Sequence, residues 1–157
     1  MHTPPPEPTA VIEPAERLSS DALTERVSLS VRGIRPTPSE LDEVAADPAR
    51  LETLVDEWML TPEFAETVRD LHAEIWGLRI DGEDQWPPAG PVADRTPAEL
   101  AESLNEEPLR LVEDVVMAGR PYTDVLTRTD VVADEISALV NGIDRETGEG
   151  WTPGVYT

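Results

Sequence analysis

The chain has 157 residues, enough for one domain, and its 33 acidic and 12 basic residues give a net charge of −21. Every base is arginine, so lysine Schiff bases and Walker phosphate loops are excluded, and the absence of cysteine excludes disulfides and thiolate metal sites. An acidic surface repels nucleic-acid phosphates and anionic lipids, and no apolar run has the length of a membrane span. We therefore expect neither a nucleic-acid partner nor membrane insertion.

The simplest explanation of the acidity is solubility, because a high net charge keeps protein molecules apart in solution. Sharper explanations are a saline habitat, an acidic face for a basic partner, and weak binding of divalent cations.

Residues 1–18 are rich in proline and favour an extended arm. A helix is predicted to follow, capped by Ser19 or Ser20 and ending at Gly33. Its apolar residues Leu23 and Val27 recur with the four-residue spacing of a helix. Residues 27–31 also alternate as a strand would, but the helical spacing starts earlier and is preferred.

Three further helix starts share one device, a capping residue followed by proline, at Thr37-Pro38, Asp47-Pro48 and Thr61-Pro62. The second of these helices has a clear apolar face that includes Trp58. The third has the strongest helical stripe of the chain, and we expect it to face the core. The stripe consists of Phe64, Val68, Leu71, Ile75 and Leu78.

Residues 81–95 form an irregular loop, and a capping box at Thr96 and Glu99 starts a short helix that is expected to end near Leu104. Another helix is marked by Leu109, Val112, Val115 and Val116 and stops at Gly119. The last helix is expected from about Asp130 to Gly142, with Val132, Ile136, Leu139 and Val140 inward. These features predict an all-α fold, a compact bundle of about six helices over residues 19–142. Residues 143–157 are expected to form an irregular tail that leads into a missing domain.

No catalytic constellation is recognisable. The weak metal candidates are His72, Asp81, Asp84 and Asp144, of which the aspartates lie in loops that could hold Ca²⁺ only weakly. A single histidine with mobile carboxylates makes a poor transition-metal site, so a His72 bonded to a neighbour at the edge of the core is preferred.

The aromatic residues indicate where a partner would bind. Trp58 and Trp76 lie on or beside helix faces and are expected in the core. Trp86 and Trp151 lie in loops among proline and glycine, where aromatic side chains often contact a partner. The partner-binding candidates are Trp86, Arg120, Tyr122, Trp151 and Tyr156.

Three segments resemble one known family. They are residues 26–41, with Arg-Pro-Thr-Pro-Ser-Glu-Leu at 35–41, residues 54–64, with Thr-Pro-Glu-Phe at 61–64, and residues 119–127, with the Arg-Pro-Tyr turn at 120–122. They are similar to the cytochrome-c-associated domains of unknown function of planctomycete cytochrome C type proteins, whose opening contains a Pro-Thr-Pro elbow. The resemblance covers about residues 26–141 and leaves the Trp86 loop unmatched. It implies an exported setting and no catalytic residue, and this chain lacks the Cys-x-x-Cys-His haem motif.

Together these points predict a non-catalytic helical interaction or assembly module of an exported, periplasmic or cell-surface protein, beside a c-type cytochrome or another redox partner. No cofactor is expected within the chain, and haem is expected only in a partner or a missing domain. One alternative is a domain or subunit of a haem-linked enzyme whose catalytic part lies elsewhere. A second alternative is an acidic cytoplasmic protein.

Overall fold

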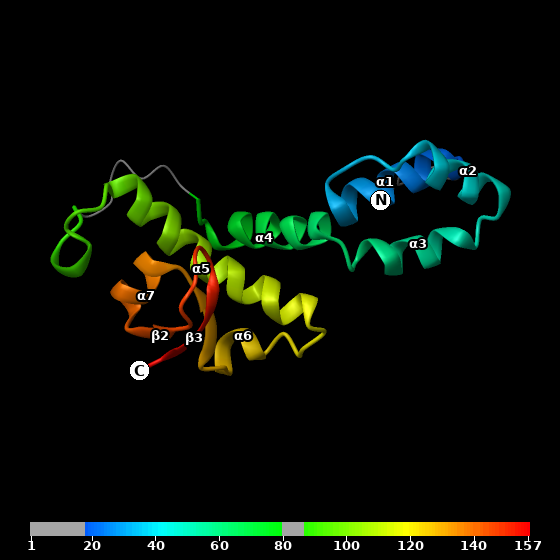
Figure 1. The fold of residues 1–157 in the computed structure, drawn as a ribbon. Coiled ribbons are helices and arrows are strands. Elements are labelled where there is room, and N and C mark those ends of the chain that lie inside the picture. The colour runs from blue at the N-terminus through cyan, green and yellow to red at the C-terminus, as the bar shows by residue number, and fades with distance from the viewer. Residues whose placement is uncertain (1–17, 80–86) are drawn as a thin grey trace, which may run out of the picture.

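The computed structural model describes residues 18–79 and 87–157, which are mostly helical with one small sheet (Figure 1). The helices are α1 (Ser20–Arg32), α2 (Pro38–Ala46), α3 (Arg50–Trp58), α4 (Pro62–Trp76), the 3-10 turn η2 (Gly90–Val92), α5 (Pro97–Met117), α6 (Asp124–Thr127) and α7 (Glu135–Asn141). The strands are β1 (Asp130–Ala133), β2 (Ile143–Arg145) and β3 (Thr152–Tyr156). The prediction of a mostly helical fold is confirmed, but the sheet shows that the fold is not strictly all-α.

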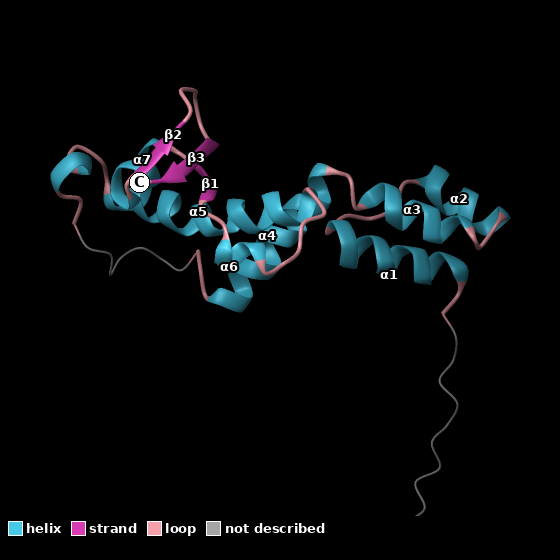
Figure 2. Ribbon diagram, turned by 90° about the horizontal axis from the view of Figure 1, so that it is seen from below, coloured by secondary structure: helices cyan, strands magenta, loops and turns pink. Residues whose placement is uncertain are grey.

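Helix α4 connects two groups of elements. Helices α1 to α3 lie together at one end of α4, whereas α5, α6, α7 and the sheet lie at the other end, and both views agree (Figures 1 and 2). α4 contacts α1 in the first group and α5 in the second. The first group has its own apolar core of Val44, Leu54 and Trp58. The second group has two buried clusters, one around Val131 and Ile143 and one around Leu100 and Ile136.

The expected caps are present where threonine precedes proline. The side chains of Thr37 and Thr96 each accept a hydrogen bond from the backbone N–H three residues on. The carboxylates of Glu40 and Glu99 accept in return from the backbone N–H of the capping threonine, which completes the capping boxes of α2 and α5. Thr61 caps α4 in the same manner. These contacts involve neighbours in sequence only, which is why the pattern of residue types was sufficient to predict them.

The start expected at Asp47-Pro48 is wrong by two residues. The carboxylate of Asp47 accepts a hydrogen bond from the N–H of Ala49 at 3.0 Å, which closes a turn, and α3 begins at Arg50 without a side-chain cap. Asp side chains often bond to the backbone two residues on, and this turn competes with helix capping.

Helix α1 is a helix as preferred, capped by Ser19 and ended by Gly33 in the left-handed region at a φ of 68°. Its buried face, however, is the polar row of Thr24, Ser28 and Arg32. The apolar row that includes Leu23 lies to one side and Leu23 itself is exposed. The polar row is turned inward because the Arg32 side chain belongs to a buried network of hydrogen bonds.

This network joins α1, α2 and α3. The guanidinium of Arg32 lies 4.2 Å from the centroid of the Trp58 ring and donates to Ser28 and, at 3.2 Å, to Oε2 of Glu40. The indole N–H of Trp58 donates to Oε1 of Glu40 at 2.6 Å. The N–H of Thr37 donates to Oε2 at 2.6 Å. Burial raises the pKa of Glu40, but the hydrogen bonds from Thr37, Trp58 and Arg32 outweigh it and lower the pKa to about 2.

Helix α5 is continuous, which corrects the two helices expected on either side of Leu104. Pro108 lies inside it and has no N–H to donate to the carbonyl of Leu104. Such a proline costs a helix about 3 kcal/mol. Leu109, Val112 and Val115 beyond it are fully buried. Burial of large aliphatic side chains contributes about 1.5–3 kcal/mol each, so tertiary packing outweighs the missing bond.

The last helix is shorter than expected, because residues 130–133 form β1 instead. Their burial alternates between exposed Asp130 and buried Val131, as in a strand with one covered face. α7 starts only after Asp134, which forms a capping box with Ser137, and it ends at Gly142 as expected. The side chains of Leu139 and Val140, expected inward, are exposed.

The C-terminal residues contain two strands, which corrects the expectation of an irregular tail. The sheet order is β1-β3-β2, and both pairs are antiparallel. Ala133 pairs with Thr152, and Ile143 with Tyr156. A Cβ on Gly154 would lie 2.6 Å from the Ile143 side chain and 3.1 Å from a backbone oxygen, so β3 can take its central place only with glycine there. Glycine is a poor strand former, so the local pattern concealed the strand.

Within residues 18–79 and 87–157, no helix combines the length and the apolar character that crossing a bilayer requires.

Candidate functional site

A row of large apolar side chains on α4 faces solvent. Leu71 is 53% exposed and Ile75 is 65% exposed, although both belong to the stripe expected to face the core. α4 instead buries Val68 and a row of mainly small residues, Ala65, Arg69 and Ala73. Small side chains allow neighbouring helices to approach closely, so α1 and α5 cover that side and leave Leu71 and Ile75 uncovered.

Aromatic rings continue this row onto the turn before α6. The ring centroid of His72 lies 5.0 Å from that of Trp76 and 5.8 Å from that of Tyr122. Trp76 was expected in the core but is 38% exposed, because it occupies the last turn of α4. Tyr122 is 54% exposed. We call Leu71, His72, Ile75, Trp76 and Tyr122 the α4 surface.

His72 holds this surface together through both ring nitrogens. Nδ1 lies 2.7 Å from the carbonyl oxygen of Val68, which can only accept, so Nδ1 carries a proton and donates. Nε2 lies 3.1 Å from the hydroxyl oxygen of Tyr122, within hydrogen-bond distance. His72 is thus bonded to neighbours at the edge of the packed region, in the arrangement preferred from the sequence.

Arg120, a partner-binding candidate, is engaged within its own turn. Its guanidinium lies 3.2 Å from Asp124 and 3.5 Å from Asp130. These ion pairs join the turn to α6 and β1. Arg120 therefore positions the neighbouring Tyr122, and we assign it to the support of the α4 surface.

Charges around α4 are predominantly acidic, because its arginine is buried. The Arg69 side chain forms ion pairs with Glu66 and with Glu113 of α5. Arg79, just beyond the helix, pairs with Asp70 and with Glu106 of α5. The bonds to Glu113 and Glu106 attach α4 to α5, and the sequence pattern did not reveal them, since these partners lie far apart along the chain.

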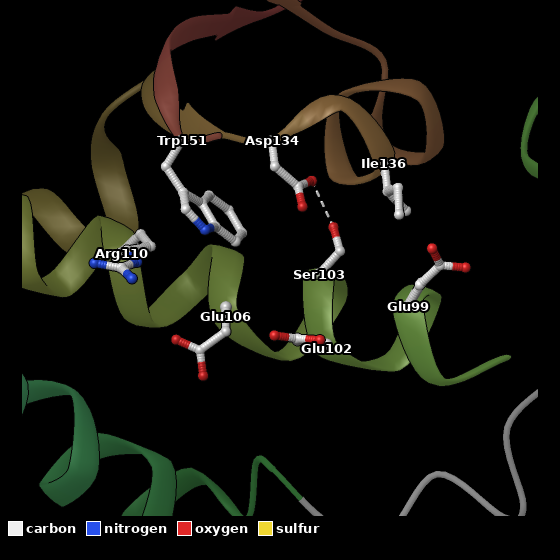
Figure 3. Close-up of a pocket in the computed structure, with 8 residues that line it drawn as sticks. All are labelled: Glu99, Glu102, Ser103, Glu106, Arg110, Asp134, Ile136 and Trp151. Carbon is white, nitrogen blue, oxygen red and sulfur yellow. Dashed lines mark hydrogen bonds between the residues drawn. The ribbon is translucent and has the colours of Figure 1, made fainter. Parts of the chain in front are cut away.

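A second feature is a hollow of about 370 Å³ between α5, the start of α7 and the turn before β3 (Figure 3). Its lining residues are Glu99, Glu102, Ser103, Glu106, Arg110, Asp134, Ile136 and Trp151. The hydroxyl of Ser103 donates to Asp134 at 2.6 Å, so the proton of this serine is directed at a carboxylate that also caps α7. This bond fastens α7 to α5.

Trp151 belongs to this hollow and is half-buried. Its ring lies 5.8 Å from the guanidinium of Arg110, which also bonds to Glu113 at 3.0 Å. The cationic partner of the ring is therefore supplied by the chain itself. The turn that carries Trp151 is attached to α5 by this contact.

Tyr156 is likewise bonded within the chain. Its hydroxyl donates to Glu107 at 2.9 Å, and Asn141 donates to the same carboxylate at 3.1 Å. Burial, the hydrogen bond to Glu107 and the charge of that carboxylate raise the pKa of Tyr156 to about 12. Tyr156 thus closes β3 onto α5.

The metal candidates do not converge. Asp144 lies on β2 and His72 on α4. Asp81, Asp84 and the partner candidate Trp86 lie outside the described residues. Among the residues that the structure does describe, no three His, Asp or Glu side chains are arranged to hold a metal ion.

Leu71, Ile75 and Trp76 are surface residues that the sequence interpretation assigned to the core. One signal could have separated them from core positions: alanine recurs at 65 and 73 on another side of the same helix, and small residues mark close helix contacts.

No family model, no curated protein and no solved structure matches the chain.

Proposed function

We propose that this chain is a non-catalytic interaction module that binds another protein through the α4 surface. The observation that carries the proposal is that the apolar stripe of α4 presents Leu71 and Ile75 to solvent. Single exposed apolar side chains are ordinary, but a group that continues into a tryptophan and a tyrosine marks an interaction site.

The rings are also held in place before a partner arrives. His72 is bonded to the α4 backbone and to Tyr122, and Arg120 fixes the turn that carries Tyr122. Rigid aromatic side chains lose little conformational entropy on binding. A preorganised surface of this kind favours recognition of a protein.

The sequence resemblance supports a setting for this activity. We propose an exported or cell-surface protein that acts beside a c-type cytochrome or another redox partner. Absorption in the Soret region by the partner recovered from the native host would support this setting, and a partner without haem would count against it.

Site-specific photo-crosslinking in the native host tests the interaction itself. A photoreactive amino acid at position 71 should give a defined cross-linked protein, and the same amino acid at exposed Glu52 on α3 serves as the matched control. Equal products at both positions, or none at position 71, would contradict the proposal.

A further inference from the structure

We infer that the occupant of the α4 surface is an amphipathic helix of another protein, with an apolar stripe edged by lysine or arginine. This inference rests on the proposed function and adds the chemistry of the partner. It follows from the shape of the surface and from the charges beside it.

The helical form follows from the backbone. The surface is the side of a helix, whose own N–H and C=O groups are bonded to one another. A segment lying across it gains no backbone hydrogen bond from α4, so the surface favours a helix, whose backbone groups are already bonded to one another. Leu71 and Ile75 are four residues apart, which suits a second helix whose side chains fit between them.

The basic edge follows from charge. The exposed charged residues of α4 are all acidic, namely Glu63, Glu66, Asp70 and Glu74, and the arginine of α4 is buried. Glu66 and Asp70 already pair with Arg69 and Arg79, so among the described residues of this helix the uncompensated negative charge lies on Glu63 and Glu74. The net charge of the chain is −21. Acidic side chains beside an apolar stripe favour partners with positive charge and repel those with negative charge.

A second copy of the chain is a poor occupant for the same reason. Two copies in contact through α4 would bring the exposed carboxylates of both helices together. Like charges held close across an interface cost binding free energy, and the buried arginines cannot compensate them across the interface.

Binding of designed peptides to the full chain tests the inference. The probe is an amphipathic Leu/Lys helix of about 18 residues, long enough to be helical when bound. A scrambled peptide of the same composition keeps the charge but lacks the stripe. We expect the wild-type chain to bind the Leu/Lys helix at least about tenfold more tightly than the scrambled peptide, as measured by fluorescence anisotropy.

Two variants separate the apolar and the charged contributions. Leu71→Gln with Ile75→Gln keeps helix-forming residues and the net charge, and it should weaken binding about tenfold or more. Glu74→Gln should weaken binding a few-fold more than Glu52→Gln, which is its control on α3. The difference between the two variants should become smaller at high salt. Circular dichroism confirms that each variant is folded.

Four results would overturn the inference. Equal binding of the scrambled peptide means that charge alone attracts the probe. Equal effects of Glu74→Gln and Glu52→Gln mean that the acids beside the stripe are not used. A wild-type dimer in sedimentation that the Leu71→Gln/Ile75→Gln variant dissociates assigns the surface to a second copy. If position 71 cross-links to another protein but the Leu/Lys helix does not bind, the inferred partner chemistry is refuted and the proposed function still stands.

Discussion

Protonation of Glu40 should remove a substantial part of the stability of the group formed by α1, α2 and α3. Its carboxylate accepts from Trp58, Arg32 and the backbone of Thr37, and its side chain is only 15% exposed. Its pKa in the folded chain is about 2, against an ordinary value of 4.5. Each pKa unit corresponds to about 1.4 kcal/mol, so the difference corresponds to about 3 kcal/mol of unfolding free energy.

The sign follows from the direction of the difference. Because the pKa of Glu40 is lower in the folded state, the unfolded chain binds the proton more readily. The contribution is fully present above about pH 4.5 and is lost as the pH falls toward about 2. Contact of the carboxylate with water reduces the figure, so we expect about 1–3 kcal/mol.

The measurement is urea unfolding followed by tryptophan fluorescence and circular dichroism between pH 7 and pH 2. At pH 7, Glu40→Gln should be less stable than the wild type by about 1–3 kcal/mol, because an amide cannot accept all three bonds. The deficit should shrink below pH 4.5 and nearly vanish near pH 2. Glu52→Gln, on the exposed face of α3, should change stability by less than about 0.5 kcal/mol. A deficit that stays constant with pH, or none at pH 7, would refute the reasoning.

Three other substitutions test the second group of elements by the same urea unfolding at pH 7. Gly154→Ala should destabilise the chain by about 2 kcal/mol or more, because the added Cβ would overlap β2, and unchanged stability would refute the register of β3. Pro108→Ala should stabilise it by about 1–3 kcal/mol by restoring a helical hydrogen bond; a loss of stability would show that the proline ring packs favourably. Tyr156→Phe should cost about 1–2 kcal/mol, because Glu107 loses one of its two donors, and no cost would mean that water replaces the hydroxyl.

Local patterns predicted several helix boundaries correctly. The caps at Thr37, Thr61 and Thr96 and the stop at Gly33 depend on contacts within a few residues of one another. Such contacts form wherever the residue types occur in that order, so they can be recognised without knowledge of the fold.

The candidate site was predicted in part. Tyr122 was selected as a partner residue, and its place beside His72 and Trp76 came only from the structure. Trp151 and Tyr156 were selected for the same role, but both are bonded to α5 within the chain. The sequence indicates that a large aromatic side chain in a loop will pack against something. It does not show whether the contact is made by the same chain or by a partner.

The sequence by itself determined where the chain can start and stop helices, and it determined the acidic charge that limits the choice of partner. The tertiary structure alone decided which side of α4 is covered, that α5 continues through Pro108, and that Gly154 lies in a strand between two others. Burial and strand pairing depend on residues far away in sequence, whereas capping and charge do not. The exposure of Leu71 and Ile75, on which the proposed function rests, belongs to the part that only the folded chain decides.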